Sequence, residues 1–159
     1  MAKTFFITGA EGTGKTSIIP YLKENLPNLE IHDFDEVGVP ENPPLQWRLD
    51  TTLYWIKIAE KNQEKNLSTC IIGLSFPSEV NDFKESEKLN KISFCLLDVN
   101  KEEREKRLGK RNASNEVIAD IDPLNKLRNE IKKLKVIDTS NLSIEETANK
   151  VINWIKNET

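Results

Sequence analysis

The sequence predicts an α/β fold of three layers, in which helices cover both faces of a parallel sheet of about five strands. Strand-like and helix-like segments alternate along the chain, with no linker, internal repeat or low-complexity tract between them. The 159 residues, 37% of them hydrophobic, are enough for one ordinary domain with a single core. We therefore expect residues 1–159 to form one domain.

The first strand and the helix that follows its loop are the clearest elements. The strand is expected at Lys3–Thr8, a short aromatic and β-branched run typical of a buried central strand. The helix is expected at Lys15–Leu26, where apolar residues recur at helical spacing. Further strands are expected, with helices between them, at Leu29–Asp33, Ser68–Leu74, Lys91–Asp98 and Leu134–Asp138.

Capping signals mark the start of two later helices. Asp122 followed by Pro123 places a cap before a proline at the first helical position. Ser143 and Glu146 have the spacing of a capping box. The helix after this box carries one apolar stripe, which indicates packing on a sheet. The stripe consists of Ile144, Ala148, Val151, Ile152 and Ile155.

A glycine-rich stretch lies between the first strand and its helix. Residues 9–16 read Gly-Ala-Glu-Gly-Thr-Gly-Lys-Thr, the pattern of a phosphate-binding loop. The glycines let the backbone turn so that successive N–H groups point at phosphate oxygens. We therefore expect an ATP site; a chance glycine-rich turn is the alternative. The residues expected to bind ATP are Gly9, Ala10, Glu11, Gly12, Thr13, Gly14, Lys15, Thr16 and Ser17.

Two residues of this loop have individual roles in the prediction. Lys15 is expected to reach the β- and γ-phosphates and so to act in catalysis. Thr16 offers a hydroxyl to Mg²⁺, whose charge offsets that of the triphosphate.

Acidic residues follow the second predicted strand, at the sheet edge where ligands bind in open α/β folds. Asp33 and Asp35 alternate along extended chain and can face one side together. Such a pair can hold Mg²⁺, here through Asp35, and accept a proton from an acceptor hydroxyl. A solvated acidic loop is the alternative. After the third strand, Gly73 permits close backbone approach to a ligand, although a plain turn also explains it.

A row of arginines follows the fourth predicted strand. Arg104, Arg107 and Arg111 are spaced by three and four residues and so share one helical face. Guanidinium groups can neutralise the transferred phosphoryl group, so Arg107 and Arg111 are expected to act in catalysis, and Arg107 also to bind the nucleotide. Glutamates interleave with these arginines, so a solvated, salt-bridged helix is the alternative.

The composition argues against nucleic acid and membranes as partners. The net charge of −3 does not favour a broad contact with nucleic acid or an anionic membrane. Cys70 and Cys95 fall inside apolar runs, as core thiols of a reducing compartment do. The sequence shows no signal peptide and no apolar stretch near 18 residues. We expect a cytoplasmic protein, a monomer or a homodimer, whose partner is a small-molecule acceptor.

Together these patterns make the chain similar to the nucleoside and nucleotide kinase-like branch of P-loop proteins, which includes adenylate, shikimate and gluconate kinases. The resemblance implies a P-loop NTPase fold with a short mobile lid at about residues 104–122. It implies transfer of the ATP γ-phosphate to a hydroxyl or phosphate acceptor, bound by Asp33, Asp35, Arg48 and Gly73. The motifs that carry it are Gly9–Thr16, Asp33 with Asp35, Arg107-Leu108 with Arg111, and Ile137–Ser140.

The sequence departs from the named kinases after the third strand. Adenylate kinases carry Asp-Gly-Phe-Pro-Arg there, whereas residues 74–78 read Leu-Ser-Phe-Pro-Ser and lack both the acid and the arginine. Shikimate kinases carry three glycines, of which only Gly73 matches. Trp47 and Trp55 can wall an acceptor pocket or belong to the core.

The sequence leaves two other functions open. A non-catalytic nucleotide sensor or switch can keep the loop without acceptor chemistry. A GTPase is less favoured, because Asn100-Lys101-Glu102-Glu103 is a poor match to the guanine-reading Asn-Lys-x-Asp. A general ATPase is less favoured because the strand ending at Leu74 lacks the acidic pair that activates water.

Overall fold

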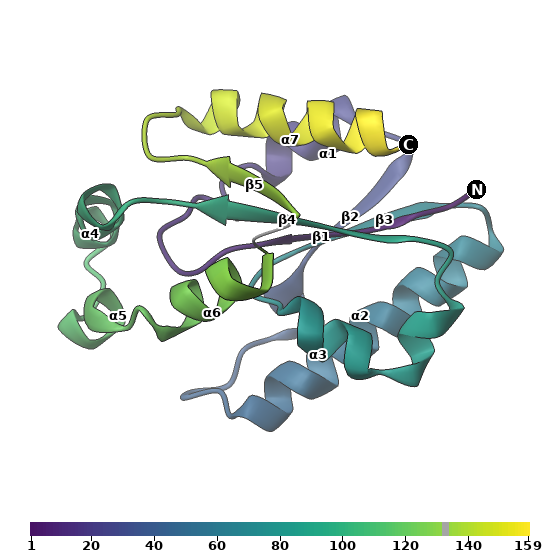
Figure 1. Ribbon diagram of the computed structural model, residues 1–159, viewed down its shortest axis with the longest axis horizontal. Coiled ribbons are helices and arrows are strands. Elements are labelled where there is room, and N and C mark those ends of the chain that lie inside the picture. The colour runs from purple at the N-terminus through teal and green to yellow at the C-terminus, as the bar shows by residue number, and fades with distance from the viewer. Residues whose placement is uncertain (132–133) are drawn as a thin grey trace.

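The computed structural model describes residues 1–131 and 134–159 and contains a five-stranded, all-parallel sheet (Figure 1). This confirms the predicted fold class. The strand order is β2-β3-β1-β4-β5, so β1 lies at the centre. Each strand begins and ends within two residues of its expected bounds. The strands are β1 (Thr4–Thr8), β2 (Leu29–Asp33), β3 (Ser68–Ile72), β4 (Ile92–Asp98) and β5 (Lys135–Asp138).

Helices cover both faces of the sheet. Helices α1 and α7 lie on one face, and α2, α3 and α6 on the other (Figure 1). The helices are α1 (Ile19–Asn25), α2 (Leu45–Glu64), α3 (Pro77–Asp82), α4 (Lys101–Lys110), α5 (Asn115–Ala119), α6 (Asp122–Ile131) and α7 (Ile144–Glu158). Two short 3₁₀ helices join them, η1 (Phe34–Val37) and η2 (Lys84–Lys88). In the described part of the chain, no helix is long and apolar enough to span a bilayer.

Alternation along β1 supplies both halves of the core. Phe5 points to the α1 and α7 side, where its ring meets the edge of Trp154 at 5.6 Å between centroids. Phe6 points to the α2 side and stacks on Phe94 at 5.5 Å. Both β1 rings are fully buried, which contributes roughly 1.5–3 kcal/mol for each side chain. The central strand is therefore held from both faces, and the loop at its carboxyl end starts from a rigid base.

The chain leaves β1 and β3 toward opposite faces of the sheet. After β1 it runs to α1, whereas after neighbouring β3 it runs to α3 on the other face (Figure 1). Ligands bind at such a point, beyond the carboxyl ends of the strands. Two reciprocal hydrogen bonds fix the loop after β3 here: the Thr8 hydroxyl donates to the Ser75 carbonyl at 2.7 Å and accepts from the Ser75 N–H at 3.0 Å.

The first helix begins later than the sequence predicts. We expected it from Lys15, but residues 15–18 form turns and α1 begins at Ile19. Pro20 explains the delay in part, because it has no N–H to donate to the carbonyl of Thr16. That carbonyl instead accepts from the Ile19 N–H at 3.2 Å.

Other sequence signals are met in the structure. Ser143 forms the expected capping box with Glu146 at the start of α7. Ile144 departs from the expected apolar stripe, since it is 49% exposed, while the other four stripe residues are buried. Trp55 belongs to the core and donates from its indole N–H to the Phe34 carbonyl at 3.0 Å. Trp47 packs edge-on against the Phe34 ring. Both tryptophans therefore have a packing role.

Candidate active site

The glycines of the loop after β1 take the conformations that a phosphate-binding loop needs. Gly12 and Gly14 have φ angles of +85° and +87°, in the left-handed region that other residues rarely adopt. At Gly9 a side chain has no room, because a Cβ would meet the Thr13 hydroxyl and lie 2.9 Å from the Leu97 carbonyl oxygen. The three glycines of the motif are therefore each required by the backbone.

The same loop presents a row of backbone donors. Within the described residues, no N–H group from Gly12 to Ser17 donates a hydrogen bond to another residue. Unpaired N–H groups that follow one another around a tight turn form a concave site for anions. The loop is thus built to receive phosphate oxygens.

Lys15 projects into this loop. Its Nζ donates to the Ala10 carbonyl at 3.2 Å, which folds the side chain back across the turn. Burial lowers the pKa of Lys15, while the negative charges of Glu11 and Asp35 act in the opposite direction. An anion placed here offsets the cost of burying this ammonium group.

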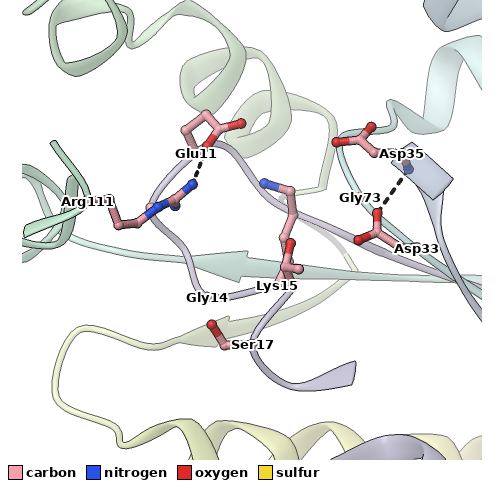
Figure 2. Close-up of a pocket in the computed structure, with 10 residues that line it drawn as sticks. Glu11, Gly14, Lys15, Ser17, Asp33, Asp35, Gly73 and Arg111 are labelled. Atoms are coloured by element: carbon pink, nitrogen blue, oxygen red, sulfur yellow. Dashed lines mark hydrogen bonds and ion pairs between the residues drawn. The ribbon is translucent and has the colours of Figure 1, made fainter. Parts of the chain in front are cut away.

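A pocket of about 330 Å³ opens over the loop. It brings together residues from the ends of β1, β2 and β3 and from the end of α4 (Figure 2). Lys15 lies between the Glu11–Arg111 pair and the two aspartates (Figure 2). The lining consists of Glu11, Gly12, Gly14, Lys15, Thr16, Ser17, Asp33, Asp35, Gly73 and Arg111. Most residues predicted for the site thus share one pocket.

The two aspartates are held by a short turn. Asp33 ends β2 and caps η1, where its Oδ1 accepts from the Asp35 N–H at 2.9 Å. Glu36 completes a capping box by accepting from the Asp33 N–H at 3.3 Å. Asp35 is exposed, but the part of it that is covered raises the pKa of its carboxyl, with a second contribution from the charge of Asp33, while Lys15 lowers it. A raised pKa suits a carboxylate that accepts a proton.

Among the oxygen-bearing side chains of this pocket are the two predicted Mg²⁺ ligands, Thr16 and Asp35. They offer a hydroxyl and a carboxylate oxygen, which are the hard ligands that Mg²⁺ prefers. In residues 1–131 and 134–159, no cluster of three or more acidic, histidine or cysteine side chains could hold a metal. The pocket fits Mg²⁺ in its usual mode, with one or two protein ligands completed by phosphate and water.

Arg104 has a structural role. Its side chain is 3% exposed and donates to the carbonyls of four residues. Those residues are Glu11 at 3.1 Å, Ile118 at 2.7 Å, Val117 at 3.1 Å and Asp120 at 3.0 Å. The guanidinium thereby ties the end of α5 to α4 and to the phosphate loop.

Arg107 and Arg111, in contrast, each contact a residue of the glycine-rich loop by a side-chain hydrogen bond. Arg107 donates to the Thr139 carbonyl at 2.6 Å, the Thr139 hydroxyl at 3.0 Å and the Gly12 carbonyl at 3.4 Å. It also pairs with Glu103 at 3.0 Å. Arg111 is largely exposed and pairs with Glu11 at 3.4 Å. Of the arginine row, Arg111 is therefore the member whose guanidinium lines the phosphate pocket.

A second cavity, of about 380 Å³, lies on the other side of the phosphate loop. Its lining includes Arg107, Arg111, Leu142 and Ser143, from α4 and from the loop before α7. The sequence predicts nucleotide contact for Arg107 but carries no signal for this cavity. It also carries no signal for the contact between Arg107 and Thr139, although Thr139 belongs to the motif Ile137–Ser140.

Two residues expected at the acceptor site have other partners. Arg48 forms a two-pronged ion pair with Glu79, at 2.7 and 3.0 Å, and lies 4.9 Å above the Phe76 ring. It lines neither of the two cavities described so far. Gly73 does line the phosphate pocket, but a Cβ there would collide with Phe34. Packing alone thus accounts for this glycine.

Comparison of the fold with solved structures finds kinases among the similar proteins. A sugar kinase from Janibacter sp. HTCC2649 aligns with a TM-score of 0.73 at 16% identity, over 98% of this chain and 95% of that one. A tunicamycin resistance protein from Deinococcus radiodurans aligns at 0.71 and 19% identity, over 98% and 96%. A gluconokinase from Sinorhizobium meliloti 1021 aligns at 0.67 and 15%, over 98% and 92%.

These likenesses establish that the chain has the P-loop kinase-like fold. A designed P-loop fold protein also aligns, with a TM-score of 0.56 and 12% identity. No family model and no curated protein sequence matches the chain. The shared property is therefore the fold, and the chemistry must be argued from the site itself.

Proposed function

We propose that this protein is an ATP- and Mg²⁺-dependent kinase that transfers the γ-phosphoryl group to a small-molecule acceptor. One observation carries the proposal. The unpaired N–H groups of the loop and the Lys15 ammonium share a pocket with Asp33 and Asp35. The kinase-like fold supports a phosphotransferase in general.

On the nucleotide side, the N–H groups of Gly12–Ser17 bind the phosphates and Lys15 neutralises their charge. The nucleoside occupies the cavity lined by Arg107 and the start of α7. Thr16 and Asp35 would hold Mg²⁺, which would supply positive charge to offset that of the triphosphate. Phosphoryl transfer requires little covalent chemistry from the protein, so positioning and charge do most of the work.

On the acceptor side, Asp35 receives the proton of the attacking hydroxyl and Asp33 keeps the Asp35 backbone in place. Segment 104–122 acts as the lid. Arg104 anchors its start to the phosphate loop, whereas exposed Arg111 closes over the transferred group.

The test is to incubate the purified protein with MgATP and a library of small hydroxyl compounds, and to measure ADP release and phosphorylated masses. We expect at least one compound to gain a phosphoryl group, with Lys15→Ala abolishing the product. If MgATP binds well but no compound is phosphorylated, the protein is a nucleotide sensor. If MgATP does not bind, the assignment of the loop is wrong.

A further inference from the structure

A third and smaller cavity, of about 140 Å³, adjoins the phosphate pocket. It lies between the phosphate loop, the chain after β3 and the corner that joins α5 to α6. Glu11, Lys15 and Asp35 line both spaces, so the two cavities meet at these side chains. A molecule in the smaller cavity therefore has a route to the phosphoryl group that Lys15 holds in the proposed function.

Acidic side chains outnumber basic ones around this small cavity. Glu11, Asp35 and Asp120 line it, and neither Asp35 nor Asp120 forms an ion pair with any described residue. Asp120 uses one carboxylate oxygen to accept from the Asp122 N–H at 3.2 Å. Asp120 is exposed, and its other carboxylate oxygen accepts no hydrogen bond from any described residue.

The two cationic side chains that line the cavity, Arg104 and Lys15, already have other partners or roles. The Arg104 guanidinium donates to four backbone carbonyls. Lys15 is assigned to the triphosphate. An acceptor that carries a phosphate or carboxylate needs an arginine or lysine with free donors, because charge-assisted hydrogen bonds bind such groups. Neither cation lining the cavity offers them.

The basic side chains farther along the same side of the sheet are also paired. Arg48 and Lys126 both bind Glu79, at 2.7 and 3.4 Å. Arg128 binds Asp98 at 2.9 Å. These ion pairs hold α2, α3, α6 and the end of β4 together. Each of these cations would therefore have to break its ion pair in order to bind a ligand.

We propose that the phosphoryl acceptor is a compact compound with a hydroxyl group and a protonated amine, and with no phosphate or carboxylate. The inference rests on the proposed kinase function. The amine lies against the Asp120 carboxylate, and the cavity of about 140 Å³ suits the amine-bearing part of an amino alcohol or a single amino sugar. Apolar walls from Leu74, Val117 and Pro123 cover the carbon frame.

The reaction balances without a further reactant. The hydroxyl oxygen forms a bond to the γ-phosphorus, and the bond from that phosphorus to the β–γ bridging oxygen breaks. The bridging oxygen leaves on ADP with the electron pair. The hydroxyl proton passes to the Asp35 carboxylate.

The test compares acceptors of one shape and different charge. Glucosamine, glucose, glucuronate and glucose 6-phosphate are each offered with MgATP, alongside ethanolamine and ethylene glycol, and phosphorylated products are measured by mass spectrometry. We expect kcat/KM for the amine in each set to exceed that for the neutral partner by about tenfold or more. The two anionic sugars should give no product.

Variants at Asp120 locate the effect. Asp120→Asn should raise KM for the amine about tenfold, since it removes a charge-assisted contact, while leaving MgATP affinity unchanged. D120K should invert the charge preference among the sugars. Asp82→Asn, which removes an exposed aspartate on α3 far from the cavity lining, is the matched control and should have no effect.

Two failures are distinguishable. If an anionic acceptor is preferred, or if Asp120→Asn leaves KM unchanged, the acceptor class is wrong while the kinase function stands. If MgATP binds and no acceptor of any charge is phosphorylated, the kinase function itself is contradicted.

Discussion

The phosphate loop and the acidic turn after β2 face each other across one pocket, yet they hold their functional groups in different ways. The loop uses backbone N–H groups, oriented by glycines at φ angles near +85°. The turn uses two side chains, oriented by one Asx hydrogen bond between Asp33 and the Asp35 N–H. Backbone sites restrict the residue type at each position, whereas a carboxylate can be delivered to the same place by many sequences.

The two regions share one electrostatic property. Burial lowers the pKa of Lys15 and raises the pKa of Asp35, so the folded chain disfavours the charged form of each. In the proposed function, a ligand of opposite sign offsets each charge: a triphosphate at Lys15, and a cation or a proton at Asp35. Variants in the two regions can therefore distinguish a loss of MgATP binding from a loss of phosphoryl transfer. They can also distinguish a loss of activity from a change in the free energy of unfolding.

The largest effect is expected at Asp35. Asp35→Asn keeps the size and removes the proton acceptor, so transfer to an identified acceptor should fall by about 10²–10⁴-fold while MgATP affinity changes far less. Steady-state kinetics and calorimetry measure the two quantities. The comparison variant is Asp33→Asn, which can still accept from the Asp35 N–H through its amide oxygen. Full transfer by both variants would place the catalytic carboxylate elsewhere.

The next effect separates Arg104, within α4, from Arg111, which follows the last residue of that helix. Arg104→Ala removes a buried guanidinium that satisfies four carbonyls, so the free energy of unfolding should drop by roughly 2–4 kcal/mol. Arg111→Ala should change it by less than about 0.5 kcal/mol, because the side chain is exposed, but should slow transfer. Urea unfolding and kinetics check both. Equal stability of the two variants contradicts the structural role of Arg104.

A smaller effect tests the phosphate loop. Lys15→Ala removes one charge-assisted contact, so MgATP binding should weaken by roughly 1.5–3 kcal/mol. Lys106→Ala is the matched control, since Lys106 is exposed on α4 and lines none of the three cavities. Calorimetry with folded protein gives both values. Equal affinities for the two variants would exclude Lys15 from the phosphate site.

The same contrast explains what the sequence could predict. All five strands lie within two residues of their expected bounds. Apolar patterning is most direct for β1, β3 and β4, because these strands are mostly buried and leave little freedom in residue type. The phosphate loop was readable because its backbone requires glycine at Gly9, Gly12 and Gly14. The helix cap at Ser143 was readable for a similar local reason.

The rest depended on contacts between distant segments. Helical spacing placed Arg104, Arg107 and Arg111 on one face. Only the packing of α5 against α4 shows that the Arg104 guanidinium donates its hydrogen bonds to backbone carbonyls. Arg48 was expected at the acceptor, and nothing local reveals its pairing with Glu79, which lies 31 residues away. The late start of α1 combines Pro20 with the turns of the loop, and periodicity does not detect such a boundary.

The smallest expected effect comes from the variant that has the largest one. Asp35→Asn should lower the rate of phosphoryl transfer but slightly raise the free energy of unfolding. The folded pKa of Asp35 is raised, so its ionised form destabilises the folded state above that pKa, and the effect vanishes below the ordinary value of 3.8. Asp35→Asn should therefore raise the free energy of unfolding at pH 7 by a few tenths of a kcal/mol, since Asp35 is exposed and solvent screens the charge. Well below pH 3.8 the variant and the unmodified protein should be equally stable. Urea unfolding at both pH values measures the difference. A variant less stable at pH 7 would mean that the Asp35 charge supports the turn, and that its place in the pocket is a matter of folding and not of transfer.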